Sequence, residues 1–105
     1  MASAVITKKD TLDRIVGCSG QLHQFGVHAI GLFGSFSRNQ ANEQSDVDLL
    51  VEFDEGKKTF DNFIETCFLL ENVLGRRVEL VTEESLSPYL KPHIMEELEY
   101  VPLSN

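Results

Sequence analysis

The amino-acid sequence predicts an α+β (α/β) fold, a short mixed β-sheet flanked by helices. Apolar residues repeat with helical spacing in some segments and with strand spacing in others, and the two kinds of segment alternate irregularly. This order is typical of one mixed sheet packed against helices. The 105 residues suffice for a single domain over 1–105, whose core is large enough to fold without disulfide bonds.

The first helix is predicted over 8–25. Thr7 and Asp10 resemble a capping box, and apolar residues then follow at helical spacing. Gly26 is a plausible helix end, and the apolar segment 27–33 is predicted as a buried strand.

A second strand is predicted over 46–53, after a short helix over 35–42 for which Ser35 is the candidate N-cap. Strand residues alternate between two faces of a sheet. One face of this strand therefore carries only apolar side chains, while the opposite face carries Asp46, Asp48 and Glu52 together with Leu50. The apolar face consists of Val47, Leu49, Val51 and Phe53.

A helix is predicted over 60–74, with Gly75 as its stop and its three phenylalanines assigned to the core: Phe60, Phe63 and Phe68. A third strand, 76–81, follows. Its Glu79 faces away from its apolar neighbours. A short helix within 88–98, kinked or restarted at Pro92, and a terminal edge strand complete the prediction.

The charge and composition exclude several classes of function. The net charge is −8 with only nine lysines and arginines, scattered along the chain, which argues against a nucleic-acid partner. No apolar run approaches the roughly 20 residues of a membrane span, so no membrane association is expected. Cys18 and Cys67 are interpreted as buried free thiols, consistent with a cytoplasmic protein.

Two carboxylates at the start of the second strand form a candidate metal site. Asp46 and Asp48 lie on the same face of the strand, roughly 6.6 Å apart along its axis. This spacing suits two Mg²⁺ ions shared between carboxylates and substrate phosphates. Glu79 is the polar exception in an apolar strand, and it completes a carboxylate triad if its strand neighbours the second one.

A candidate anion site precedes these carboxylates. Gly34 and Ser35 follow an apolar strand at a predicted helix start, where free backbone N–H groups bind phosphate. Arg38 follows on the same face of that helix as Ser35 and can reach a phosphate oxygen. Each feature alone is common on protein surfaces. Their combination favours a metal–triphosphate site.

Two segments, GSFSRNQANEQSDVDLLVEF (34–53) and RRVELVTEESLSPYLKPHIMEELEYV (76–101), resemble the minimal nucleotidyltransferases (MNT) of the DNA polymerase beta-like nucleotidyltransferase superfamily. Members of this group are the antitoxins of HEPN/MNT toxin–antitoxin modules. The resemblance implies the nucleotidyltransferase fold and Mg²⁺-dependent transfer of AMP from ATP to a hydroxyl, typically a tyrosine of the partner HEPN ribonuclease toxin, with which the chain would form a hetero-oligomer.

Carried over position by position, the resemblance assigns Gly34, Ser35 and Arg38 to the nucleotide, and Asp46, Asp48 and Glu79 to catalysis and metal binding. Three positions depart from the family pattern. Asn39 stands where glycine usually follows the motif arginine, Phe36 stands where the residue is often basic or small, and Glu79 stands where aspartate is usual.

These departures leave two alternatives to an active protein adenylyltransferase. In one, a weak or inactive module neutralises the toxin by binding it. In the other, the enzyme transfers AMP to a small molecule. The length of 105 residues leaves no room for a separate acceptor-binding domain, which favours an acceptor on another protein or a small molecule.

Overall fold

A computed structural model describes residues 3–104, with four strands in one sheet of order β3-β2-β1-β4. β1 pairs antiparallel with β2 and β4, whereas β2 and β3 are parallel, so the predicted α+β fold with a mixed sheet is confirmed. The elements are α1 (Lys8–Gly17), α2 (Ser19–Gln24), β1 (Val27–Phe33), α3 (Gly34–Ser37), β2 (Val47–Phe53), α4 (Phe60–Leu74), β3 (Val78–Val81), the 3₁₀ turn η1 (Glu83–Ser85), α5 (Lys91–Glu97) and β4 (Glu99–Tyr100).

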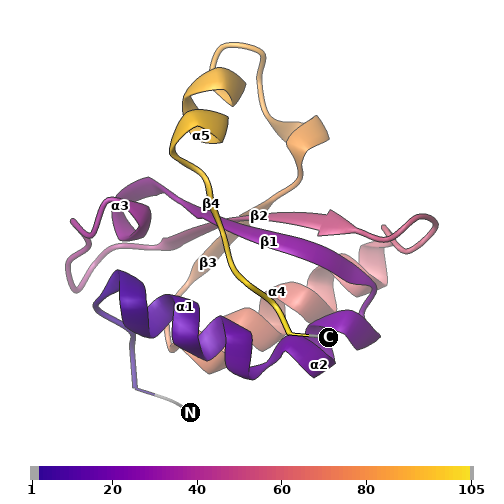
Figure 1. Cartoon of the computed structure of the whole chain (residues 1–105), viewed down its shortest axis with the longest axis horizontal. Coiled ribbons are helices and arrows are strands. Elements are labelled where there is room, and N and C mark those ends of the chain that lie inside the picture. Colours follow the sequence, from indigo (N-terminus) through magenta and orange to yellow (C-terminus); the bar gives the residue numbers. More distant parts are fainter. Residues whose placement is uncertain (1–2, 105) are drawn as a thin grey trace.

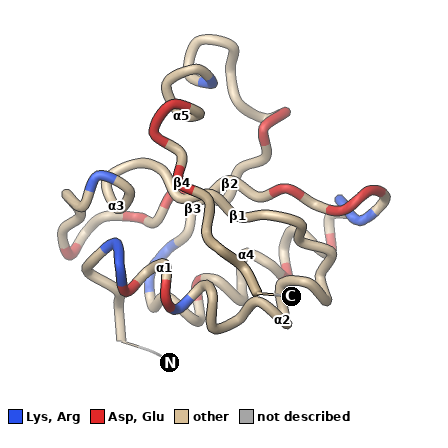
Figure 2. Tube along the Cα trace, in the orientation of Figure 1, with Lys and Arg blue, Asp and Glu red and all other residues tan. Residues whose placement is uncertain are grey.

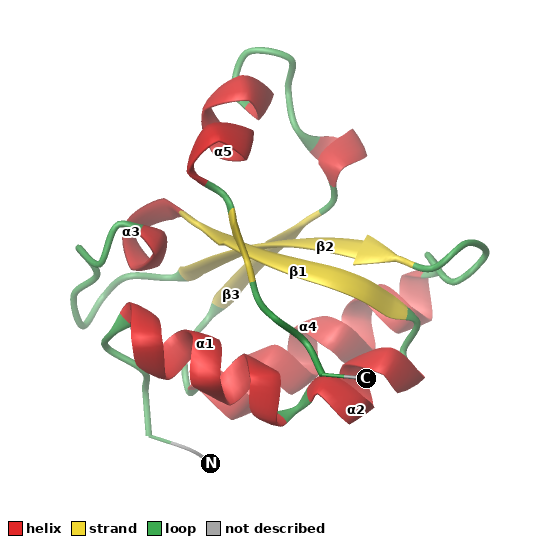
Figure 3. Ribbon diagram, viewed as in Figure 1, coloured by secondary structure: helices red, strands yellow, loops and turns green. Residues whose placement is uncertain are grey.

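The helices flank the sheet unequally. α1, α2 and α4 lie together on one side of it, and α5 and η1 project from the other side (Figure 1; Figure 3). The core lies between the sheet and the first three helices, and it draws its buried side chains from both layers: Ile15, Leu22, Ile30, Leu32, Leu49, Leu70 and Leu74 among others.

The helix predicted over 8–25 is two helices, so that prediction was wrong in its middle. Thr7 caps α1 as expected, because its Oγ accepts the N–H of Asp10 at 3.1 Å. The chain leaves helical geometry at Cys18 and resumes it in α2. Gly17 and Gly20 flank this break, and glycine costs about 1 kcal/mol relative to alanine inside a helix, so a bend here is inexpensive.

The turn after β1 is shorter than predicted. α3 is one turn, Gly34–Ser37, instead of a helix over 35–42, and its N-cap is Phe33, not Ser35. The helix stops because Asn39 adopts a left-handed conformation with φ of 56°. One turn is too short for a helix dipole to matter, so any anion bound here must depend on individual N–H and guanidinium donors.

The alternation predicted for β2 is confirmed. Val47, Leu49 and Val51 are 0–1% exposed and face the helices. The strand begins at Val47, so Asp46 lies just before it.

The boundaries of α4 are confirmed, but two of its phenylalanines are not in the core. Thr59 caps the helix and Gly75 ends it with φ of 67°. Phe60 is 79% exposed and Phe68 61% exposed, whereas only Phe63 packs against the core. Phe68 is two residues from buried Leu70, about 200° around the helix, and therefore points outward.

The C-terminal third returns to the sheet as predicted. α5 carries Pro92 in its first turn, where the missing N–H is tolerated, and β4 pairs with β1 at the edge of the sheet. Between them, Leu98 packs on Gly31 of β1, where a Cβ would lie 2.6 Å from a Leu98 methyl carbon. This contact fixes the end of α5 against the strand that leads to Gly34.

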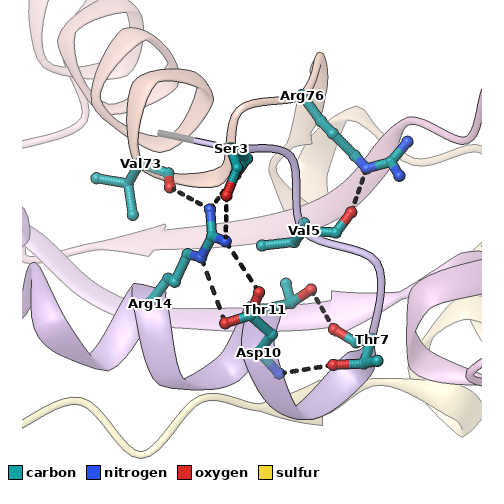
Figure 4. Close-up of polar contacts among 8 residues, drawn as sticks. All are labelled: Ser3, Val5, Thr7, Asp10, Thr11, Arg14, Val73 and Arg76. Atoms are coloured by element: carbon teal, nitrogen blue, oxygen red, sulfur yellow. Dashed lines mark hydrogen bonds and ion pairs between the residues drawn. The ribbon is translucent and has the colours of Figure 1, made fainter. Parts of the chain in front are cut away.

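Two arginines attach the N-terminal segment to the rest of the fold (Figure 4). Arg14 of α1 donates hydrogen bonds to the backbone carbonyls of Ser3 and Val73 and pairs with Asp10. Arg76 donates through Nε to the carbonyl of Val5 at 2.5 Å.

The two cysteines are free thiols. Cys18 is buried and Cys67 half-buried, and burial raises the pKa of each. Across residues 3–104, no helix has both the length and the apolar composition needed to cross a membrane.

Candidate active site

The sheet places Asp48 beside two other predicted site residues. Asp48 pairs with Phe33, the residue before Gly34, on its β1 side, and with Glu79 on its β3 side. β3 therefore neighbours β2, as the carboxylate triad required. Residues that are more than thirty positions apart in the chain meet at one end of the sheet.

Gly34 is required at its position for two reasons. Its φ of +75° lies in the left-handed region that favours glycine, and a Cβ there would lie 2.1 Å from Oδ2 of Asp48. Any side chain at residue 34 would thus displace the Asp48 carboxylate. The predicted anion and metal sites are consequently in direct contact.

The environment of Asp48 is strongly acidic. Burial is the main cause that raises its pKa to about 6, and a hydrogen bond and the negative charge of Glu79 raise it further. The charges of Asp46 and Glu97 act in the same direction. Figure 2 shows acidic stretches at the start of β2 and on α5, with a basic stretch at the end of α3 between them.

Glu97, the last residue of α5, also lies at this site, although no sequence pattern predicted it. Its Oε1 accepts the backbone N–H of Gly34 at 2.9 Å, and its Oε2 accepts Nη1 of Arg38 at 2.9 Å. Ser37 also donates its hydroxyl to the Glu97 carbonyl at 3.0 Å. No sequence signal pairs these residues, because 63 positions separate Glu97 from Gly34 and only the return of β4 to β1 brings them together.

Asp46 is exposed, and the loop before it is held by Arg76. The Arg76 guanidinium donates to the carbonyls of Glu43 and Ser45 at 2.9 and 3.1 Å. It also stacks over the ring of Phe36 at 5.3 Å. Phe36 itself is 1% exposed, so its departure from the family pattern serves the core.

The other two predicted anion ligands differ in accessibility. Ser35 is half-buried next to Gly34, and Arg38 is exposed. Arg38 also donates Nε to Gln40 at 3.2 Å, which leaves part of its guanidinium free of bonds within the described residues. The backbone conformation accounts for asparagine at position 39, where the family usually has glycine. Its φ of 56° is left-handed, and asparagine tolerates that conformation better than most non-glycine residues.

The acidic residues are not gathered into a ready-made metal cage. Among residues 3–104, no three His, Cys, Asp or Glu side chains are arranged to hold an ion by themselves. Mg²⁺ is usually bound by one or two carboxylates together with phosphate oxygens and water, so the all-oxygen donor set of Asp46 and Asp48 beside the Gly34 turn fits that ion. A hollow of about 330 Å³ lies at the other end of β2 and is lined by none of these residues.

The model of the nucleotidyltransferase domain family matches residues 12–101 of this chain. The chain belongs to that family. It is therefore an enzyme of the nucleotidyltransferase class, and the resemblance described above is confirmed. Among the relatives of this nucleotidyltransferase, protein adenylyltransferase MntA of Thermococcus cleftensis is 45% identical over 78 residues, which are 74% of this chain and 78% of the relative. A second relative, from Methanocaldococcus jannaschii, is 42% identical over 80 residues, 74% of this chain and 80% of its own.

Solved structures of the same fold include toxin–antitoxin complexes. One is a toxin–antitoxin crystal structure with AMP-PNP. The match spans 90% of this nucleotidyltransferase and 74% of the chain in that structure, with a TM-score of 0.66 and 22% identity. Another is a tri-AMPylated Shewanella oneidensis HEPN toxin in complex with MNT antitoxin. The match spans 93% of this nucleotidyltransferase and 74% of the chain in that structure, with a TM-score of 0.62 and 20% identity. At these identities the two structures establish the fold alone.

Proposed function

We propose that this nucleotidyltransferase transfers AMP from ATP to a tyrosine hydroxyl of a cognate HEPN ribonuclease toxin in the cytoplasm, and thereby acts as its antitoxin. The observation that carries the proposal is the contact between the Gly34 turn and Asp48, with Glu79 in register beside it. An anion-binding turn and a carboxylate pair in contact suit a metal-bound triphosphate. The name of the relative MntA and the composition of the HEPN–MNT complexes support a protein acceptor.

Each residue has a role that follows from its chemistry. The Gly34 N–H, the Ser35 hydroxyl and the Arg38 guanidinium would bind and orient the phosphate oxygens. Asp46 and Asp48 would hold Mg²⁺, two ions being the usual number for such transfers, and Glu79 would be the third acidic ligand. When bound, Mg²⁺ neutralises phosphate charge and polarises the phosphoryl group. Glu79, which is more exposed than Asp48, would also accept a proton from the attacking hydroxyl.

The overall charge of the chain supports a protein rather than a nucleic-acid acceptor. A net charge of −8 repels phosphate backbones but is compatible with a basic partner. The alternative of toxin neutralisation by binding alone remains in the proposal because Glu79 replaces the usual aspartate. Glutamate has one methylene more than aspartate, so its carboxylate is shifted. Such a shift can lower the rate of a positioned reaction on the order of a hundredfold. Transfer to a small-molecule acceptor is the other alternative.

The decisive experiment measures intact mass. The chain is incubated with Mg–ATP and the helical protein encoded by the adjacent gene, which should carry an R-x-x-x-x-H motif. We expect whole AMP units to be added to that partner, and to disappear with Asp46→Asn. Glu55→Gln, in the exposed 54–58 turn, is the matched control and should leave the addition intact. No added mass, with toxin neutralisation surviving Asp46→Asn, would sink the enzymatic proposal in favour of binding alone.

The role of Glu79 has its own test. Glu79→Gln keeps the size of the side chain but removes its charge and proton affinity, and Glu79→Asp restores the usual family residue. We expect Glu79→Gln to lose most of the transfer rate and Glu79→Asp to equal or exceed the parent. Transfer by Glu79→Gln at the parent rate would remove Glu79 from the site.

A further inference from the structure

The carboxylate of Glu97 occupies the position that the proposed function assigns to a phosphate group. It accepts hydrogen bonds from Gly34 N–H and from Arg38, both at 2.9 Å, and it forms an ion pair with that arginine. These are two of the three donors expected to bind the triphosphate. A carboxylate and a phosphate present similar oxygen acceptors to such donors.

Contacts on both sides of Glu97 hold its carboxylate close to Gly34. Glu97 is the last residue of α5, and Ser37 of the same α3 turn holds its backbone carbonyl. The next residue, Leu98, packs on Gly31, and the residue after that pairs with Leu32 of β1. These contacts hold the backbone of Glu97 beside the α3 turn, and its carboxylate can leave Gly34 without a large movement of the chain.

The donors cannot satisfy Glu97 and a phosphate equally well at the same time. The single Gly34 N–H has one hydrogen to donate. Arg38 is the only basic residue that the structure shows in contact with Glu97 among residues 3–104, and their pairing neutralises its charge. Asp46, Asp48 and Glu79, which surround this turn, are acidic and do not themselves attract a phosphate.

We propose that Glu97 is an internal competitor for the phosphate subsite, which the nucleotide must displace in order to bind. This inference rests on the proposed function only in that Gly34 and Arg38 bind the triphosphate. The apparent affinity for nucleotide is then the intrinsic affinity reduced by the fraction of molecules in which Glu97 has left. The nucleotide therefore binds more weakly as long as Glu97 holds the Gly34 N–H and Arg38.

Calorimetric titration with Mg–AMP-PNP, without any acceptor, tests the proposal. We expect Glu97→Ala to bind the nucleotide about tenfold more tightly than the parent. Glu97→Gln keeps the shape and one acceptor oxygen but not the charge, and should fall between the two. Glu96→Gln, at the exposed preceding position on α5, is the matched control and should bind like the parent. Circular dichroism checks that each variant is folded.

An opposite result would overturn the proposal. If Glu97 instead orients Arg38 for the nucleotide, both Glu97 variants will bind AMP-PNP more weakly than the parent. Unchanged affinity, or no binding by Glu97→Ala, would also overturn it. Tighter binding by Glu97→Ala in a chain that adds no AMP to any partner would support the competitor while removing the proposed transferase function. If the parent adds AMP to a partner but Glu97→Ala binds AMP-PNP with unchanged affinity, the transferase function stands and the competitor role of Glu97 is removed.

Discussion

The two faces of β2 differ in what they contribute to the molecule. On one face, Val47, Leu49 and Val51 are 0–1% exposed and pack under the helices. On the other, Asp48 and Glu52 are half-buried and meet polar partners from β3 and β4. Because neighbouring residues of a strand alternate between faces, stability and chemistry are encoded one residue apart. A single substitution can therefore test either property alone.

The largest effect is expected from the polar face. Asp48→Asn removes a proposed metal ligand, whose loss should cost several kcal/mol of transition-state stabilisation, or a rate decrease on the order of 10³-fold. The folded chain should not be destabilised, because a half-buried negative charge that other acids repel also disappears. Initial rates of AMP transfer and thermal unfolding measure the two effects. A rate within tenfold of the parent would contradict the assignment of Asp48.

The reverse result is expected one residue later. Leu49→Ala leaves a cavity at a fully buried position and should lower the free energy of unfolding by about 2–5 kcal/mol. Activity per folded molecule, measured at low temperature, should change by less than about threefold. Urea denaturation gives the stability. Phe68→Ala, on the exposed side of α4, is the control and should cost less than about 0.5 kcal/mol.

A smaller effect should appear as a pH dependence of stability. The pKa of Asp48 is about 6 in the folded chain and 3.8 without the surrounding structure, so the folded state binds the proton more tightly. Stability from this group is therefore greatest below about pH 4, falls as the pH rises toward 6, and stays low above it. Since the side chain is only half-buried, screening reduces the effect to about 1 kcal/mol.

The measurement compares the parent with Asp48→Asn in EDTA at pH 4.5 and pH 7.5. We expect the variant to gain stability over the parent on going to pH 7.5. Glu55→Gln corrects for the general effect of removing an acid. An equal difference at both pH values would show that Asp48 has no raised pKa.

The smallest effect lies at the far end of the polar face. Tyr100 donates its hydroxyl to Glu52 at 2.5 Å, and this hydrogen bond is the main cause that raises the pKa of Tyr100 to about 12. Glu52→Gln should lower that pKa toward 10, with a change in stability of a few tenths of a kcal/mol. Ultraviolet titration of phenolate formation follows it, and Tyr100→Phe assigns the signal. A titration that Glu52→Gln does not move would rule out the contact in solution.

Local patterns predicted most of the fold. The alternation in β2, the end of α4 at Gly75 and the position of Pro92 in α5 each depend on neighbouring residues, and the structure agrees with them. The errors occurred where tertiary context decides. Helical spacing ran through Cys18 although two glycines allow a bend there, and Phe60 and Phe68 were assigned to the core from their apolar character although their positions on α4 face outward.

The candidate site divides in the same way. The order of Gly34, Ser35, Arg38, Asp46 and Asp48 is local and could be read from the sequence. The pairing of Asp48 with Glu79 required the assumption that β3 neighbours β2, which the structure confirms. Glu97 could not be predicted, because its contact depends on a segment that returns over the sheet from 59 residues beyond Arg38.

The left-handed turn at Asn39 has a consequence for the unfolded chain. Glycine at this position would adopt the same φ without strain, but it would also give the unfolded backbone more conformations to lose on folding. Asparagine visits the left-handed region more readily than other side chains while limiting that freedom. It also accepts the N–H of Lys8 at 3.2 Å, which ties the turn to the start of α1. With asparagine instead of glycine at residue 39, the unfolded backbone therefore has less conformational entropy to lose when the turn beside Arg38 forms.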